Sequence, residues 1–369
     1  MAKKKVYLSI LAIFVFIAYT ILAAQPVPAE IILTNKWVKA LDSITAEEEP
    51  VPGAKALIPF MLGNRFGYVD SDGRLFLNQE REKIVSFSPE YWAEYDPAPE
   101  ELVIHDPLSD LEITLEKPGG YPVFMDGRIL LISKDQTSLK ELNRDGEVLW
   151  QYDYEAPVTS LDAAGGYVIT GTLDGMIDLL KRDGSLFFSS YAPGASRIPV
   201  ILGCRISSDG SRIAVVSGID KQRFLFSELY GNTNYRVTYH EFLKGEGYRR
   251  EVFMSFVGNN TQVVFEQESG LGVYDVQTRT TITLPIAGRM ESQFQARLEA
   301  MDEEGGDGLF FYVSSGSGRG EKRFVVLKLP GTELLNVPFK SEVSFLTRRG
   351  NELFIGGGMT LASFTIDRR

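Results

Sequence analysis

Short apolar runs separated by turn residues occupy most of the chain from Ala56 onward. The pattern is clearest over Asn143–Ser190, where the runs are divided by Asp145-Gly146, Gly165-Gly166, Asp174-Gly175 and Asp183-Gly184. Asp-Gly between two β-prone runs is typical of a two-residue hairpin, because a type I′ turn requires positive φ at both central residues. The stretch therefore predicts a tight antiparallel meander of short strands.

Groups of such strands recur along the chain. The strand that opens each group begins near residues 56, 122, 157, 199, 251, 292 and 341, and the runs between 84 and 116 continue the first group. From residue 122 on, the intervals scatter around ~40–45 residues, the length of a four-stranded propeller blade. No convincing 3.6-residue period follows residue 55, although Glu291–Met301 is compatible with either a helix or a strand. We predict an all-β β-propeller of about seven four-stranded antiparallel blades, within a range of six to eight.

Some strands lack the alternation of a half-exposed strand. Arg128–Ser133, Val263–Phe265 and Leu309–Val313 are apolar almost throughout, which is typical of strands covered on both faces. Blades that pack face to face around an axis provide such cover for their middle strands. Phe224–Leu229 alternates and is predicted to be an outer strand.

The amino terminus carries a different pattern. Lys3–Lys5 precede Val6–Ala24, a run of 19 residues without a charge. As a helix this run would span roughly 28 Å, close to the hydrocarbon thickness of a bilayer. It predicts either a transmembrane signal anchor or a signal peptide, and Val27-Pro28-Ala29 offers small residues for a cut before Glu30. In both cases the basic flank places residues 25–369 outside the cytoplasm, in the cell envelope or periplasm or secreted after cleavage.

Three segments are thus expected. Residues 1–24 form the signal anchor or signal peptide, residues 25–54 a proline-punctuated linker or lead-in, and residues 55–369 the propeller. Within the lead-in, Glu30–Asp42 is compatible with either a strand or a short helix.

Composition excludes some functions. The net charge of −11 argues against nucleic acid as a partner, because phosphates require a basic face. Cys204 is the only cysteine, so an intrachain disulfide is impossible. Its apolar surroundings in Val200–Ile206 predict a buried, unreactive thiol.

One region resembles a known class of repeat. LNRDGEVLW at 142–150 and the meander at 157–188, with its Gly171-Thr172-Leu173-Asp174-Gly175 turn, resemble repeats of the PQQ-like and WD-like β-propeller superfamily. The stretch 207–214 resembles the start of a WD-like blade. The resemblance is sharpest over residues 140–215 and implies a fold but hardly any chemistry.

Quinoprotein dehydrogenases share this fold, and such a resemblance would imply a calcium-bound quinone stacked on a tryptophan. Many of these enzymes also carry a vicinal disulfide, which a single cysteine cannot form. Trp150 sits at a blade exit, where packing is its expected role. We therefore expect no cofactor.

Catalytic and metal motifs are weak. His105 and His240 are the only histidines, and neither has a neighbouring nucleophile or acid motif. Asp70-Ser71-Asp72-Gly73 lacks the closing glutamate of a calcium loop and predicts a hairpin turn. Carboxylates are plentiful, so a glycosidase-type pair stays open, although no spacing selects one.

Function is expected where the repeat is interrupted, at Asp96–Glu101, Glu228–Arg250 and Asp302–Gly320. The second of these combines tyrosine and arginine, which are enriched at binding hot spots, although ordinary strand tyrosines would explain it too. The candidate partner-binding residues are Tyr230, Tyr235, Arg236, Tyr239, Tyr248 and Arg249.

These features predict a non-catalytic, extracytoplasmic scaffold that binds protein partners and contacts the membrane through its amino terminus. The alternative is a carboxylate-based, carbohydrate-active envelope enzyme that uses the propeller channel, and a third reading is ligand sensing without turnover. Inward-facing carboxylates with arginine at the channel mouth would favour the enzyme. An apolar or tyrosine-rich rim would favour the scaffold.

Overall fold

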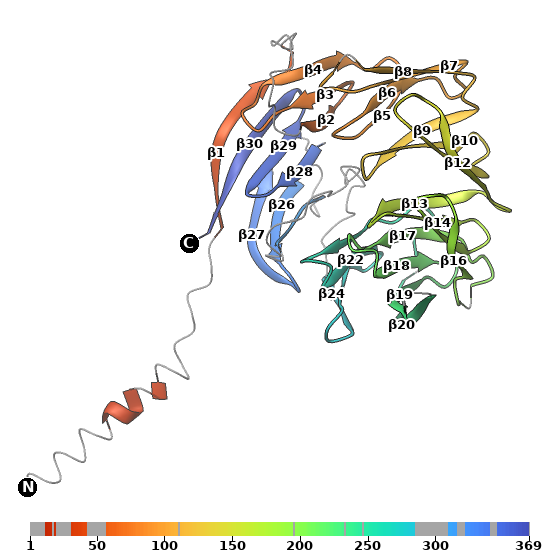
Figure 1. Cartoon of the computed structure of the whole chain (residues 1–369). Helices are drawn as coiled ribbons and strands as arrows, with labels where there is room; N and C mark the ends of the chain where they lie inside the picture. Colours follow the sequence, from red (N-terminus) through yellow and green to blue (C-terminus); the bar gives the residue numbers. More distant parts are fainter. Residues whose placement is uncertain are drawn as a thin grey trace, which may run out of the picture.

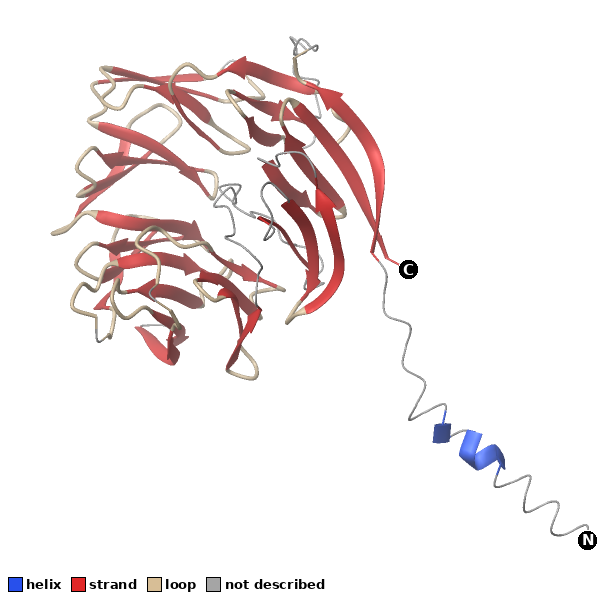
Figure 2. Cartoon of the chain, turned by 180° about the vertical axis from the view of Figure 1, so that it is seen from behind, coloured by secondary structure: helices blue, strands red, loops and turns tan. Residues whose placement is uncertain are grey.

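The computed structural model describes residues 12–16, 18–19, 31–42, 57–109, 111–194, 196–231, 234–245, 247–284, 309–315, 322–339 and 345–368. Within these residues the strands form eight antiparallel sheets arranged around a ring (Figures 1 and 2). The all-β propeller is confirmed, and it has eight blades.

The first four blades run in chain order. Blade 1 holds β2 (Ile58–Leu62), β3 (Arg65–Val69) and β4 (Leu75–Glu80). Blade 2 holds β5 (Ile84–Phe87), β6 (Trp92–Tyr95), β7 (Glu101–His105) and β8 (Glu112–Glu116). Blade 3 holds β9 (Gly120–Met125), β10 (Arg128–Ser133), β11 (Ser138–Leu142) and β12 (Val148–Asp153). Blade 4 holds β13 (Val158–Ala164), β14 (Tyr167–Thr172), β15 (Met176–Lys181) and β16 (Leu186–Tyr191).

The last four blades complete the ring. Blade 5 holds β17 (Ile201–Ile206), β18 (Arg212–Ser217), β19 (Arg223–Tyr230) and β20 (Asn234–Phe242). Blade 6 holds β21 (Met254–Val257), β22 (Gln262–Gln267), β23 (Gly270–Asp275) and β24 (Thr280–Leu284). Blade 7 holds β25 (Leu309–Ser315), β26 (Lys322–Lys328) and β27 (Thr332–Phe339). Blade 8 holds β28 (Phe345–Arg349), β29 (Glu352–Gly357), β30 (Thr360–Arg368) and β1 (Ile31–Ala40).

The prediction of seven blades was wrong because residues 84–116 form a blade of their own. β5 pairs with β6 and β7 pairs with β8, in one four-stranded sheet. β5 and β6 contain four residues each, so their apolar periodicity is too short to stand out from the neighbouring runs.

The ring is closed by the two ends of the propeller. β1 is the outermost strand of blade 8 and pairs antiparallel with β30, with Ile31 opposite Arg368 and Ala40 opposite Thr360. The two strands lie side by side in both views (Figures 1 and 2). Of the two alternatives for Glu30–Asp42, a strand or a short helix, the structure has a strand at Ile31–Ala40. The predicted lead-in therefore contributes a strand to the last blade.

The amino terminus is described only in part. Residues 12–16 and 18–19 are helical, and no helix among the described residues is long and apolar enough to cross a membrane. The remainder of the predicted anchor, the possible cleavage site at 27–29, the 291–301 stretch and the loops at 302–308 and 316–320 lie outside the described residues.

The core is divided among the contacts between blades. Seven apolar clusters each join two successive blades around the ring. β10 shows how one strand serves two of them: Ile129 and Leu131 pack towards blade 2, whereas Leu130 and Ile132 pack towards blade 4. A middle strand is therefore apolar at every position because each of its faces meets a neighbouring blade. This confirms the expectation for Arg128–Ser133.

The junction of blades 1 and 2 uses aromatic contacts. The rings of Phe66 and Trp92 lie 5.4 Å apart, and the Tyr68 hydroxyl donates to Ser88 O at 2.7 Å. The side chain of Tyr68 is fully buried, and this burial raises its pKa. The hydroxyl also lies 3.0 Å from Tyr91 O, so a buried polar group of blade 1 is satisfied by backbone carbonyls next to blade 2.

The prediction for Phe224–Leu229 was wrong. It lies in β19, the third of four strands, and Phe224 and Phe226 are fully buried between blades 5 and 6. The polar residues of this stretch, Ser227 and Glu228, are adjacent and half-buried, so they do not mark one face of the strand as exposed to solvent.

The Asp-Gly turns differ from the predicted type I′ geometry. In the three turns of the 143–190 meander only the glycines have positive φ, between 78° and 92°, whereas the preceding aspartates do not. In the first turn the amide of Gly146 donates to Asn143 O at 3.1 Å, and Asn143 Oδ1 accepts from the amide of Glu147 at 2.8 Å. A polar side chain at the start of the turn thus caps a four-residue loop with a left-handed glycine. Gly165-Gly166 does have positive φ at both residues.

Candidate functional site

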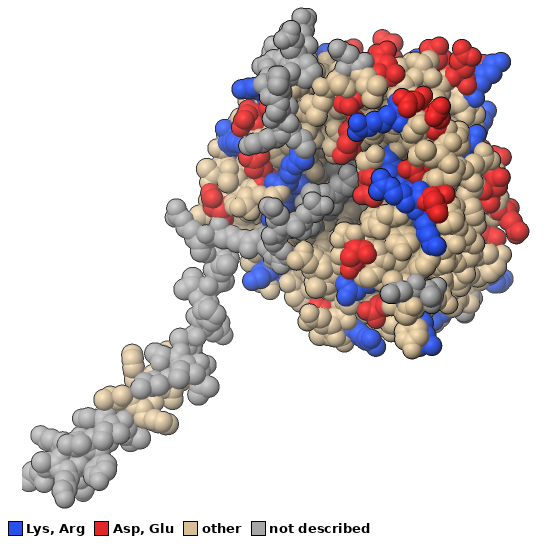
Figure 3. Space-filling model, in the orientation of Figure 1, with Lys and Arg blue, Asp and Glu red and all other residues tan. Residues whose placement is uncertain are grey.

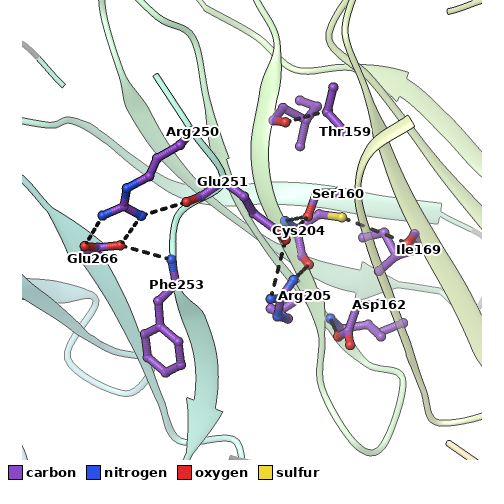
Figure 4. Close-up of polar contacts among 12 residues, drawn as sticks. Thr159, Ser160, Asp162, Ile169, Cys204, Arg205, Arg250, Glu251, Phe253 and Glu266 are labelled. Carbon is purple, nitrogen blue, oxygen red and sulfur yellow. Dashed lines mark hydrogen bonds and ion pairs between the residues drawn. The ribbon is translucent and has the colours of Figure 1, made fainter. Parts of the chain in front are cut away.

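Polar side chains on the first strands of blades 4 and 5 form a network of hydrogen bonds (Figure 4). First strands of successive blades contact one another, as β13 and β17 do. Ser160 Oγ accepts from the amide of Cys204 at 3.0 Å, and Asp162 Oδ2 accepts from the amide of Ile206 at 3.1 Å. Donors and acceptors are both two residues apart, so they lie on the same side of each strand. The two side chains therefore extend backbone pairing across the blade boundary.

The network continues into blade 6. Arg250 binds Glu266 through two nitrogens, at 2.9 and 2.6 Å, and also donates to Glu251 O at 2.9 Å. Glu266 is buried and raises the pKa of the Arg250 guanidinium above its usual value. Such a bidentate pair is geometrically specific. It fixes the segment that leads into β21 (Figure 4).

Glu251 is the exposed carboxylate of this network, with 56% of its side chain accessible. Its Oε1 lies 3.5 Å from Ser160 Oγ and 3.9 Å from the Arg205 guanidinium. Arg205 also donates to Cys204 O at 2.7 Å. Among the described residues no group of three or more His, Cys, Asp or Glu side chains is placed to hold a metal ion. The contacts of the network hold blades 4, 5 and 6 against one another.

Cys204 is buried, and burial raises the pKa of its thiol to about 12. We expect a water-soluble disulfide reagent to leave the native protein unmodified at pH 8 and to modify one thiol per chain in denaturant, because only the thiolate reacts. Absorbance of the released chromophore measures this. Rapid modification of the folded protein would show that the thiol is accessible and would contradict the assignment.

A second polar cluster is wholly buried in blade 3. Arg128 donates to Glu141 through Nε at 3.0 Å and through Nη2, and the indole nitrogen of Trp150 donates to the same carboxylate at 2.7 Å. These residues come from three adjacent strands. The Trp150 ring lies against Gly184 of blade 4, where an added Cβ would clash with the ring. Trp150 therefore has the predicted packing role. It also contacts the charged side chains of Arg128 and Glu141, which its position in the sequence did not indicate.

The two histidines lie in different blades, His105 on β7 and His240 on β20. His105 stacks on Trp92 with ring centroids 4.1 Å apart, and its Nδ1 lies 3.2 Å from Glu112. Burial lowers the pKa of this imidazole more than Glu112 raises it. His240 is exposed on β20. Each histidine thus lies within a single blade, and His105 has a packing role.

The structure separates the predicted partner-binding residues. Tyr235 is buried, donates to Gly210 O and has a pKa raised by burial. Tyr239 is half-buried and stacks on Tyr274 at 4.6 Å. These two tyrosines support blade packing, as the alternative interpretation expected.

The remaining candidates lie at opposite ends of the β19–β20 hairpin. The Arg236 guanidinium lies 4.0 Å from the centre of the exposed Tyr230 ring, at the hairpin tip. Tyr248 and Arg249 follow the other end, where Phe242 is opposite Arg223. Eight residues of extended strand separate the ends by about 26 Å. The candidates therefore do not form one surface.

Charges are mixed on the face seen in Figure 3, where Lys and Arg side chains are interspersed with Asp and Glu. This face presents no extended field of a single sign. Recognition of nucleic acid requires an extended basic surface. That nucleic acid is not a partner of this chain stays a prediction.

Comparison with known proteins finds a matching family, a relative and similar solved structures. A model of a family described as beta-propeller protein matches residues 1–368. A protein of Treponema pallidum (strain Nichols), described as uncharacterized, is 28% identical over 293 residues, 78% of this chain and 76% of that protein. BamB from Moraxella catarrhalis has a similar structure, with a TM-score of 0.55 at 12% identity over 90% of this chain and 100% of that chain.

The computationally designed Ika8 protein is also similar, with a TM-score of 0.52 at 12% identity over 85% of this chain and 98% of that chain. At these identities the solved structures show the fold alone, which is a β-propeller as the resemblance implied. Because the family model spans almost the whole sequence, the chain belongs to the beta-propeller protein family.

Proposed function

We propose that this chain is a non-catalytic propeller of the cell envelope, held outside the cytoplasm, that binds protein partners as a scaffold. The observation that carries the proposal is the order of Lys3–Lys5, the uncharged run Val6–Ala24 and the closed propeller after them. A basic flank before an apolar run stays inside, and the residues after the run are exported. The propeller then presents its loops from a rigid frame.

The hydrogen bonds of the polar network at blades 4 to 6 support a non-catalytic function. Asp162 and Glu266 accept bonds from backbone amides or from arginine, and Glu251 is the carboxylate left to solvent in this network. A glycosidase requires two carboxyl groups facing one substrate, one of them acting as an acid. In the described network Glu251 is exposed, whereas the half-buried Asp162 is bonded to the amide of Ile206, so the network supports the scaffold over the carbohydrate-active alternative.

Crosslinking and pull-down from membranes, with the intact amino terminus present, tests the scaffold. We expect a stoichiometric partner that survives extraction and disappears when the propeller is unfolded before crosslinking. Recovery of no partner under conditions that preserve membrane complexes would refute the proposal.

Sequencing the mature amino terminus decides how the chain is attached. If Val6–Ala24 is an anchor, the mature protein keeps these residues and stays with membranes in high salt and carbonate. If the segment is a cleaved signal, the mature chain starts at Glu30 and is released. A start at Glu30 would contradict membrane anchoring by this segment while leaving export intact.

A further inference from the structure

Three segments of blade 5 meet at one end of its strands. Residues 192–199 precede β17, residues 218–222 connect β18 to β19, which begins at Arg223, and residues 242–250 begin at the last residue of β20. Within these segments Ala195 and Glu246 lie outside the described residues. Figure 1 shows this blade with its strands β17 to β20 adjacent. The three segments are where the chain enters, turns within and leaves the blade.

Hydrogen bonds join these segments into one surface. Arg223 Nη1 donates to Pro193 O at 2.8 Å, which links the first segment to the residue that follows the second. The amide of Leu243 donates to Gln222 O at 2.9 Å, and Gln222 Nε2 donates to Tyr248 O at 2.5 Å. These two bonds link the second segment to the third. The surface is therefore held together by hydrogen bonds to backbone carbonyls of neighbouring segments.

The surface is basic on an acidic protein. The described residues of its three segments, together with Arg223, contain six cations, and three carboxylates face them: Asp220, Glu266, which pairs with Arg250, and Glu268, which accepts from the amide of Gly247 at 3.0 Å. The chain as a whole carries a net charge of −11. One of the carboxylates, Asp220, accepts from the hydroxyl of Ser196 and from the amide of Arg197 at 3.2 Å. The six cations are Arg197, Lys221, Arg223, Lys244, Arg249 and Arg250.

Apolar side chains lie among these cations. Ile198 is 50% exposed and Phe242 is 52% exposed, although both are large hydrophobic residues. The Arg223 guanidinium lies 5.1 Å from the centre of the Phe242 ring, and the Arg197 side chain is 92% exposed. Exposed aromatic rings and arginine side chains are enriched in protein–protein interfaces.

We propose that this surface, the blade 5 basic patch, binds an extended acidic peptide segment of a protein partner, with apolar side chains of that segment contacting Ile198 and Phe242. The proposal rests on the proposed scaffold function and names the partner's chemistry. A short acidic segment matches the local charge, whereas a long polyanion would also meet the acidic remainder of the chain. Tyr248 and Arg249 of the predicted set border this patch, and Tyr230 and Arg236 do not.

A peptide array measures the preference directly. Purified propeller is applied to 12-residue peptides of graded Asp and Glu content, with and without Phe and Leu, and the best binders are titrated by fluorescence anisotropy. The test variant is Arg197→Glu, Lys221→Glu and Arg249→Glu. The control is Arg74→Glu, Lys134→Glu and Arg182→Glu, which changes the same charge at other exposed positions.

Binding is expected to increase with acidic content, to require an apolar side chain and to weaken as salt rises. The test variant should bind at least about tenfold more weakly, because complementary charges across an interface contribute to affinity, and the control should stay within about twofold. Binding independent of peptide charge, or an equal loss in both variants, would overturn the proposal. So would loss of sedimentation with phosphatidylglycerol vesicles in the test variant while peptide binding is kept, since the patch would then bind a membrane.

The two proposals fail separately. If the test variant still captures its partner in the membrane crosslinking experiment, the patch is not the docking site and the scaffold function stands. If neither the native protein nor the variant captures a partner, the scaffold function itself fails.

Discussion

Replacing Glu141 by alanine is expected to lower the free energy of unfolding by about 3–5 kcal/mol, because it leaves a buried guanidinium without its counter-charge. Arg128 and Glu141 are 4% and 7% exposed, respectively, and the same carboxylate accepts the indole N–H of Trp150. Urea denaturation followed by tryptophan fluorescence measures the loss.

Glu155→Ala provides the matched control. Glu155 is exposed in the loop that follows blade 3, so its loss should change stability by less than about 0.5 kcal/mol. A loss for Glu141→Ala no larger than that of the control would show that the buried pair does not stabilise the blade.

Deleting residues 1–42 is expected to prevent formation of a monomeric native state. The deletion removes β1, which pairs with β30 over nearly its whole length, and it removes the buried side chains of Ile31 and Leu41. Each such side chain contributes roughly 1.5–3 kcal/mol when fully buried. The deletion also uncovers the edge of β30, and an exposed strand edge promotes association between chains.

Deleting residues 1–29 is the control, since it leaves β1 in place. Size-exclusion chromatography and urea denaturation should show a monomer with an unchanged midpoint for this control, and aggregates or a strongly reduced midpoint for the longer deletion. A stable monomer after removal of β1 would mean that blade 8 does not need the amino-terminal strand.

The individual blades can be predicted from short-range sequence patterns. Such patterns do not predict pairings between strands that are far apart in the sequence. Apolar runs divided by Asp-Gly and Gly-Gly are enough to predict antiparallel blades, because both strand and turn are encoded within about ten residues. The pairing of β1 with β30 joins the two ends of the propeller, with Ile31 opposite Arg368, and no local pattern specifies such a partner. The separate blade at residues 84–116 was also missed, because its first two strands contain only four residues each.

The candidate site was harder to predict for a different reason. Tyrosine and arginine are common in binding surfaces and equally common in blade packing, so Tyr235 and Tyr230 have the same signal although one is buried and the other exposed. Arg128 precedes an apolar strand and resembles a solvated strand end, yet its partner Glu141 lies on the adjacent strand β11. Only the register of neighbouring strands reveals such pairs.

The central claim is that the propeller functions outside the cytoplasm. Two fusions expressed through the general secretion pathway test it directly, one with alkaline phosphatase after Arg369 of the intact chain and the other with green fluorescent protein at the same point. We expect an active phosphatase and a non-fluorescent protein, because the basic flank at Lys3–Lys5 stays inside and the remainder is exported. A bright fluorescent fusion with an inactive phosphatase would place the propeller in the cytoplasm and contradict this claim.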